Sequence, residues 1–235
     1  MMEYTEPRCC FDAAAYIGTP DAGRCAATLD VPEIVRGLDA LYEHGRESEA
    51  ESYLEGWLEK ARSCGDWRAE LTVTSELLGQ YRRSANRSRG LAADSIPIFE
   101  HVCRVYSDNL DPADYRFAGL FNNMALSYSD TGDYESAERC FTAAMRITEK
   151  CEYPQNELAV TLCNMAEMYD RQDHEDARIE ECLERAWEYL SDPALPHDGY
   201  HAFTISKCAP CFDYFGFFVY AGILKERVAK IYALS

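Results

Sequence analysis

Four side chains near the C-terminal end of the sequence have the types and the spacing of zinc ligands. Three residues separate His197 from His201, and two separate Cys208 from Cys211. Zinc takes four such nitrogen and sulfur ligands in a tetrahedral site, and both spacings lie within the range of known zinc motifs. The sequence therefore offers one alternative reading, a zinc-binding or thiol-dependent protein centred on this cluster.

Other catalytic motifs are missing from the sequence. It contains no G-x-x-x-x-G-K-[ST] loop, G-x-G-x-x-G turn, H-E-x-x-H helix or G-x-S-x-G elbow, which are the local patterns that hold phosphates, zinc or a nucleophilic serine. We therefore expect a protein that is not an enzyme and that needs no cofactor.

Composition and charge limit the classes of partner that we expect this protein to bind. The 235 residues are 47% hydrophobic, which is ample for a core, and 23 basic against 41 acidic residues give a net charge of −18. Such a surface repels phosphate backbones and anionic lipids, so we expect no nucleic-acid or membrane partner. The odd number of cysteines, eleven, favours reduced thiols, and no signal peptide is visible. Both observations predict a cytoplasmic location.

The elements that position these side chains repeat along the chain. Apolar residues recur at three- and four-residue steps before a large apolar or aromatic landmark, as on one face of an α-helix. A glycine follows four residues after several landmarks, where it ends the helix, and a second amphipathic helix begins. The landmarks lie 40 to 47 residues apart, at Leu41, Tyr81, Tyr128, Tyr169 and Phe212.

Small residues recur in the second helix of the unit. Ala50, Ala137 and Ala221 stand nine residues after their landmarks, where a small side chain lets two antiparallel helices approach closely. One helix pair cannot bury its apolar faces alone, so such pairs must stack. The expected fold is an all-α, right-handed superhelical solenoid of about five antiparallel helix pairs.

This pattern resembles the tetratricopeptide repeat. The resemblance is carried by Met124-Ala125, Tyr128, Gly132, Ala137 and Phe141. The spacing exceeds the usual length of that repeat and is similar to the long-period variety of kinesin light chains and bacterial regulators. We expect an irregular arm over residues 1–30 and a repeat domain over 31–235. Its units are expected at approximately 31–64, 67–108, 115–150, 156–190 and 198–235, with Pro97 breaking or kinking the helix that contains it.

The resemblance also implies where a partner binds. In tetratricopeptide stacks the first helix of each pair lines a concave groove, and the residue five before each landmark faces it. That position holds Arg36, Glu76, Asn123, Asn164 and Lys207. The asparagines are expected to grip the backbone of a protein or peptide segment, and the two cations to orient it. Further groove candidates are Asn122, Glu167 and Arg171.

Two alternatives stay open at this point. Cys208 lies four residues before Phe212, in the slot that Met124 and Met165 occupy in earlier units, which predicts a buried thiol rather than a zinc ligand. Aromatic residues are also crowded between Tyr200 and Tyr220. They favour core packing of the last helix pair, but an apolar end could instead form a homodimer.

Overall fold

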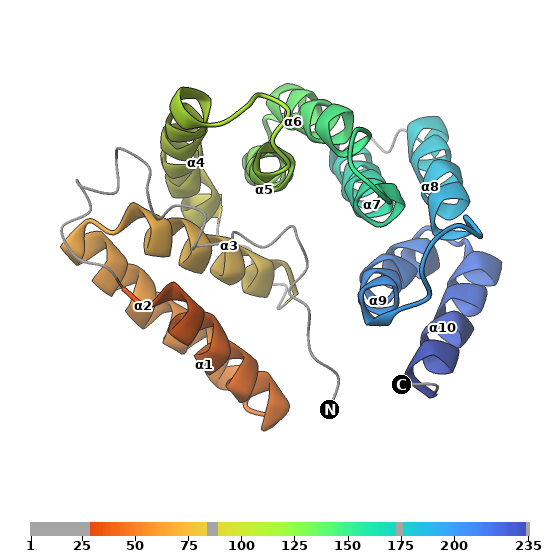
Figure 1. Cartoon of the computed structure of the whole chain (residues 1–235), viewed down its shortest axis with the longest axis horizontal. Coiled ribbons are helices and arrows are strands. Elements are labelled where there is room, and N and C mark those ends of the chain that lie inside the picture. The colour runs from red at the N-terminus through yellow and green to blue at the C-terminus, as the bar shows by residue number, and fades with distance from the viewer. Residues whose placement is uncertain (1–28, 84–88, 173–175, 234–235) are drawn as a thin grey trace. The chain divides into compact units, whose positions relative to one another are not determined.

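The computed structural model describes residues 29–83, 89–172 and 176–233, and these residues are all-α (Figure 1). A short 3-10 turn, Glu47–Glu49, precedes α2. The helices of the described residues are α1 (Val31–Glu43), α2 (Ala50–Cys64), α3 (Trp67–Arg83), α4 (Arg89–Asn109), α5 (Arg116–Thr131), α6 (Tyr134–Thr148), α7 (Gln155–Gln172), α8 (Asp176–Leu190), α9 (Gly199–Tyr214) and α10 (Phe218–Ala233). Each odd-numbered helix packs against the next even-numbered one.

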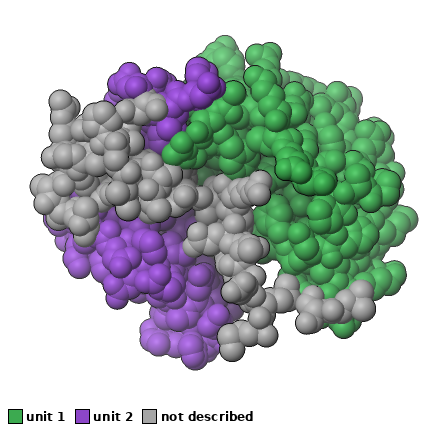
Figure 2. Space-filling model, in the orientation of Figure 1, with its two compact units in different colours: residues 1–10, 113–235 green, residues 11–112 purple. Residues whose placement is uncertain are grey.

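The chain divides into two compact units, coloured separately in Figure 2. Of the described residues, unit 1 comprises 113–172 and 176–233 and contains α5 to α10, whereas unit 2 comprises 29–83 and 89–112 and contains α1 to α4. The division into an arm over 1–30 and five repeats stays a prediction, and residues 1–28 of that arm lie outside the described residues.

Glycines end the first helix of three hairpins, as the sequence predicts. Gly45, Gly132 and Gly216 have φ angles of 66°, 88° and 84°. Residues with a Cβ atom rarely adopt this left-handed region, so glycine makes these turns at low cost. After Gly132 the carboxylate of Asp133 accepts a hydrogen bond from the Ser136 amide at 3.1 Å and starts α6.

Small residues sit at the contact between paired helices. Ala50, Ala137 and Ala221 are completely buried, and Leu54 and Phe141 fill the adjoining space. The prediction that these three alanines lie at the contact is confirmed. The core of unit 1 is continuous from α5 to α10, so hairpins that could not bury their own apolar faces share one seam.

The sequence predicts that Pro97 breaks or kinks its helix, and the break is wrong. Helix α4 runs from Arg89 to Asn109 with Pro97 inside it. Proline removes the hydrogen bond to the carbonyl of Ala93, and both residues are exposed. Water can therefore satisfy that carbonyl, while the buried face, with Phe99 and Val102, keeps the helix in place.

Helix α7 lies at the centre of unit 1. It packs against α8 within its own hairpin, and also against α5, α6 and α9. In Figure 1 the first helices of the three hairpins, α5, α7 and α9, form the inner layer of this unit, and α6, α8 and α10 form the outer layer. Among the described residues, no helix is both long enough and apolar enough to cross a membrane.

Candidate functional site

Three stripes of polar and aromatic side chains follow the inner helices of unit 1. Residues seven apart lie two turns apart on the same face of an α-helix. The stripes are Arg116, Asn123 and Asp130 on α5, Glu157, Asn164 and Arg171 on α7, and Tyr200, Lys207 and Tyr214 on α9. Because the three helices pack side by side, the stripes form three rows across the layer. We call this surface the inner face.

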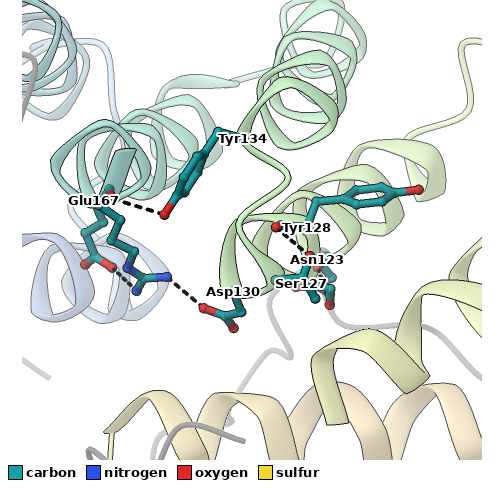
Figure 3. A network of polar contacts seen from close by, with 8 residues as sticks. Asn123, Ser127, Tyr128, Asp130, Tyr134 and Glu167 are labelled. Atoms are coloured by element: carbon teal, nitrogen blue, oxygen red, sulfur yellow. Dashed lines mark hydrogen bonds and ion pairs between the residues drawn. The ribbon is translucent and has the colours of Figure 1, made fainter. Parts of the chain in front are cut away.

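The row at the C-terminal ends of the helices is an ion-pair network. The guanidinium of Arg171 lies between Asp130 of α5, 2.7 Å away, and Glu167 of its own helix, 3.6 Å away (Figure 3). The hydroxyl of Tyr134 donates to the backbone carbonyl of Arg171 at 3.0 Å. The sequence named Arg171 and Glu167 as separate groove candidates, whereas the structure pairs them with each other and with Asp130.

The middle row holds the predicted asparagines. The amide nitrogen of Asn164 donates to the side-chain oxygen of Asn122 at 3.3 Å, and the Thr161 hydroxyl reaches the same oxygen at 3.4 Å. These bonds join α7 to α5. Asn123 is partly exposed, and its side chain makes no such bond within the described part of the chain. The two asparagines at equivalent positions therefore have different surroundings.

The two predicted cations occupy different places. Lys207 is exposed on α9, with its ammonium 4.7 Å from the centre of the Phe203 ring. It completes the middle row of the inner face. Arg36 is exposed on α1, which belongs to unit 2, so its predicted role stays separate from that of the residues in unit 1.

The row at the N-terminal ends of the helices was not predicted from the sequence. Glu157 accepts hydrogen bonds on one carboxylate oxygen, Oε1, from two tyrosine hydroxyls. Tyr200 of α9 is 2.7 Å away, and Tyr115, just before α5, is 3.3 Å away. One carboxylate therefore ties three successive hairpins together. The seven-residue spacing from Glu157 through Asn164 to Arg171 was the signal that could have found it.

The four candidate zinc ligands are not arranged around a common point. His201 is fully buried and its Nδ1 lies 2.9 Å from the Asn156 side-chain oxygen, an acceptor to which an Nδ1–H group can donate. Burial, reinforced by Arg227 and His197, lowers the pKa of His201 to about 4. Among the described residues, no group of three or more His, Cys, Asp or Glu side chains is placed to hold a metal ion.

The two cysteines of this cluster face the core instead. Cys208 is buried, as its repeat position predicts, and the Cys211 thiol lies 3.7 Å from the backbone carbonyl of Cys163. Hydrogen bonding to the thiols of Cys208 and Cys211, together with burial, raises the pKa of Cys163 well above its ordinary value. A neutral thiol is a poor nucleophile and a poor metal ligand, so this packing favours a structural role.

A known protein family matches the part of the chain that contains α5 and α7, two of the three helices of the inner face. Residues 116–186 match the model of a family described as tetratricopeptide repeat. This segment is a tetratricopeptide repeat segment. It contains α5, α6, α7 and most of α8, with Tyr128, Gly132, Ala137 and Phe141 at the positions from which the resemblance was first drawn.

Among solved structures, the chain is similar to at least two proteins. One, from Podosopora anserina, is a putative kinesin light chain with nearly identical tetratricopeptide-like repeats. It is 16% identical, with a TM-score of 0.48, over 86% of this chain and 95% of that one. Another is BtubC (BKLC) from P. vanneervenii, 19% identical with a TM-score of 0.47, over 87% and 80%. No curated protein matches the sequence significantly.

The tetratricopeptide repeat segment includes five of the eight predicted groove residues. Asn122, Asn123, Asn164, Glu167 and Arg171 all lie within residues 116–186, whereas Arg36, Glu76 and Lys207 lie outside them. Tetratricopeptide repeats are repeated helical hairpins, as α5 to α8 are in this segment.

Proposed function

We propose that this protein is a non-catalytic adaptor or regulatory sensor that binds an extended protein segment on the inner face of unit 1. The observation that supports this most directly is the middle row. It presents the amide of Asn123, which makes no side-chain hydrogen bond within the described residues, between packed repeats and in register with Asn164 and Lys207.

The chemistry of the row suits a peptide backbone. An asparagine side chain offers both a donor and an acceptor, which matches the alternating N–H and C=O groups of an extended chain. Packed helices lie about 8–10 Å apart, which is about three residues of extended chain. Asn123 on α5, Asn164 on α7 and Lys207 on α9 would then meet the ligand at successive intervals of about three residues.

We also propose a cytoplasmic location for this role. The eight described cysteines are all free thiols, and free thiols persist where the cellular redox buffer is reducing.

A library of immobilised twelve-residue peptides tests the proposal. The native protein should bind a subset of peptides that an Asn123→Ala, Asn164→Ala double variant binds about ten- to a hundredfold more weakly. Two lost hydrogen bonds at about 0.5–1.5 kcal/mol each correspond to that range. Arg146→Ala, on an exposed position of the outer helix α6, is the control and should bind like the native protein.

A second double variant separates binding from stability. Asn164 bonds to Asn122 across two helices, so its loss could act through folding, whereas Asn123→Ala, Lys207→Ala removes no such bond. If both double variants remain folded by circular dichroism and still bind every peptide as the native protein does, the inner face is not the binding surface.

Self-association is a second candidate, favoured by the surface of α10. Phe218 and Val219 are 69% and 73% exposed, and Ile223 is also exposed. The positions of Val219 and Ile223 correspond to Glu135 and Arg139 in α6, which form an exposed ion pair. Apolar residues thus replace charges on this helix, and a second copy of the chain packing against it would cover them.

Light scattering over a dilution series tests this second candidate. A homodimer should dissociate as the protein is diluted, and Val219→Lys should give a monomer at concentrations where the native protein is dimeric. A native protein that is monomeric at every concentration excludes a homodimer through α10. Peptide binding to the inner face is unaffected by either outcome.

A further inference from the structure

The carboxylate of Glu157 is held by two tyrosine hydroxyls from two other hairpins. Among the other acidic groups of the inner face, Asp130 and Glu167 share Arg171, and Asp114 forms two hydrogen bonds with the Arg116 guanidinium. Asp170 accepts a hydrogen bond from the single hydroxyl of Tyr214 at 3.3 Å. Glu157 is contacted by tyrosine hydroxyls alone. Within the described residues it has no cationic partner.

Two phenols fix the orientation of this carboxylate. Tyr200 and Tyr115 both donate to the same oxygen, Oε1, from opposite neighbouring hairpins. The second oxygen, Oε2, accepts no hydrogen bond from the described residues, and the residue is partly exposed. A carboxylate has room for about four donors. The structure therefore holds a negative charge in a set direction with one oxygen available to an incoming N–H group.

The cations of the inner face cannot balance this charge. Arg171 is occupied by Asp130 and Glu167, and Arg116 is occupied by Asp114. Lys207 lies over the Phe203 ring on α9, two turns along the stripe from Tyr200. Both arginines that a carboxylate ligand would need are already paired, so an acidic peptide would have to break an ion pair or rely on Lys207 alone.

We infer that Glu157, with Tyr115 and Tyr200, is a subsite for an arginine or lysine side chain, and that the bound segment is basic. This inference rests on the proposed peptide-binding function of the inner face. The guanidinium or ammonium group donates to Oε2 of Glu157, which is the charge-assisted bond that such groups form most strongly. The two phenol rings next to the carboxylate also suit a cation. The net charge of −18 adds long-range attraction for a basic segment.

Three labelled peptide pools test the charge of the ligand. Each pool holds fluorescein-labelled twelve-residue peptides randomised over Gly, Ser, Asn and Leu, with four positions that are all Arg, all Glu, or again neutral. Fluorescence polarisation should show the Arg pool binding native protein about five- to tenfold more tightly than the neutral pool. The Glu pool should bind more weakly than the neutral pool.

A matched pair of variants separates the subsite from the general charge. Glu157→Gln and Glu180→Gln remove one negative charge each, and Glu180 is exposed on the outer helix α8. Glu157→Gln should weaken the Arg pool by about fivefold and leave the neutral pool unchanged, while Glu180→Gln should leave both within about twofold. Tyr200→Phe keeps the ring but removes the hydroxyl, and should give an intermediate loss for the Arg pool only.

The outcomes distinguish this inference from the function on which it rests. If the Glu pool binds best and depends on Lys207, the inner face binds peptides but the basic specificity is wrong. If Glu157→Gln and Glu180→Gln weaken the Arg pool equally, the effect is the field of the whole chain and the subsite is refuted. If no pool binds, or if Asn123→Ala, Asn164→Ala changes nothing, the proposed function fails and this inference fails with it.

Discussion

The guanidinium of Arg171 lies 2.7 Å from the carboxylate of Asp130 and joins the inner helices α5 and α7 of two successive hairpins at their C-terminal ends. Only 17% of the Arg171 side chain and 11% of the Asp130 side chain are exposed. The ion pair is therefore largely shielded from water, unlike the pair of Arg139 with Glu135 on α6, whose side chains are 65% and 85% exposed.

Arg171→Ala should lower the free energy of unfolding by about 1–3 kcal/mol, because it leaves a largely buried carboxylate without its partner. Arg139→Ala should change it by less than about 0.5 kcal/mol, as expected for an exposed pair. Urea unfolding followed by circular dichroism measures both. Equal effects for the two variants would show that the Asp130–Arg171 contact does not stabilise the protein.

The two middle-row asparagines should contribute different amounts to the free energy of unfolding, as measured in the same assay. Asn164→Ala removes the bond to Asn122 and should cost about 0.5–1.5 kcal/mol of stability. Asn123→Ala should cost less than about 0.5 kcal/mol, the usual range for a surface substitution without special contacts. A large loss for Asn123→Ala would mean that this side chain supports the fold and is not reserved for a ligand.

His201 should make the stability depend on pH. Its pKa is about 4 in the folded protein, below the ordinary value of about 6.5 in the unfolded chain. The unfolded state therefore binds more protons between these values, and stability falls as the pH is lowered through that window. The loss between pH 7.5 and pH 5 should be about 2 kcal/mol.

The matching control for this effect is His201→Gln, which removes the titrating group. The variant should show a smaller decrease over the same pH range, by about 2 kcal/mol. Urea unfolding at several pH values gives the comparison. Parallel curves for native protein and variant would show that His201 titrates normally and is not shielded in the folded state.

Two glycines should respond in opposite directions to alanine. Gly132 has a φ of 88°, so Gly132→Ala should destabilise unit 1 by about 1 kcal/mol. Gly56 lies inside α2 and an added Cβ would meet nothing within 4 Å, so Gly56→Ala should stabilise the helix by about 0.5–1 kcal/mol. Thermal unfolding reports both shifts, and a stabilising Gly132→Ala would contradict the left-handed turn.

Cysteine alkylation should follow burial. Cys163, Cys208 and Cys211 are buried, whereas Cys64 and Cys140 are partly exposed, and the pKa of Cys163 is raised. A short pulse of iodoacetamide at neutral pH should label Cys64 and Cys140 first and the three buried thiols only after unfolding. Mass spectrometry of the peptides identifies the sites. Early labelling of Cys211 would contradict its burial and would favour the alternative of a thiol-dependent protein.

The features that sequence could predict are those decided within one hairpin. Ala137 and Phe141 must lie between paired helices, and Gly132 must end one, because each role follows from residue type and helical period. Pro97 was misjudged because its cost depends on whether the released carbonyl faces water, which is a property of the packed structure. The period alone cannot supply that information.

The contacts of the inner face could be predicted only in part. Asn123 and Asn164 were chosen because they share a repeat position, yet the residue that bonds to Asn164 is Asn122. Which of two adjacent side chains meets the next helix depends on the rotation of α5 against α7, and small differences in packing set that rotation. Glu157 was overlooked because its partners, Tyr115 and Tyr200, belong to the preceding and following hairpins.

The seams between hairpins differ from those inside them. Within a hairpin, alanines such as Ala137 allow long, close packing of two helices, while α6 and α7 of successive hairpins share a smaller contact. Side-chain bonds such as Tyr134 to the Arg171 carbonyl fasten those outer seams. Under a pulling force on unit 1, the hairpins should part from one another before any of them unravels. The extension of the chain would then increase in discrete steps, each of which corresponds to the release of one intact hairpin.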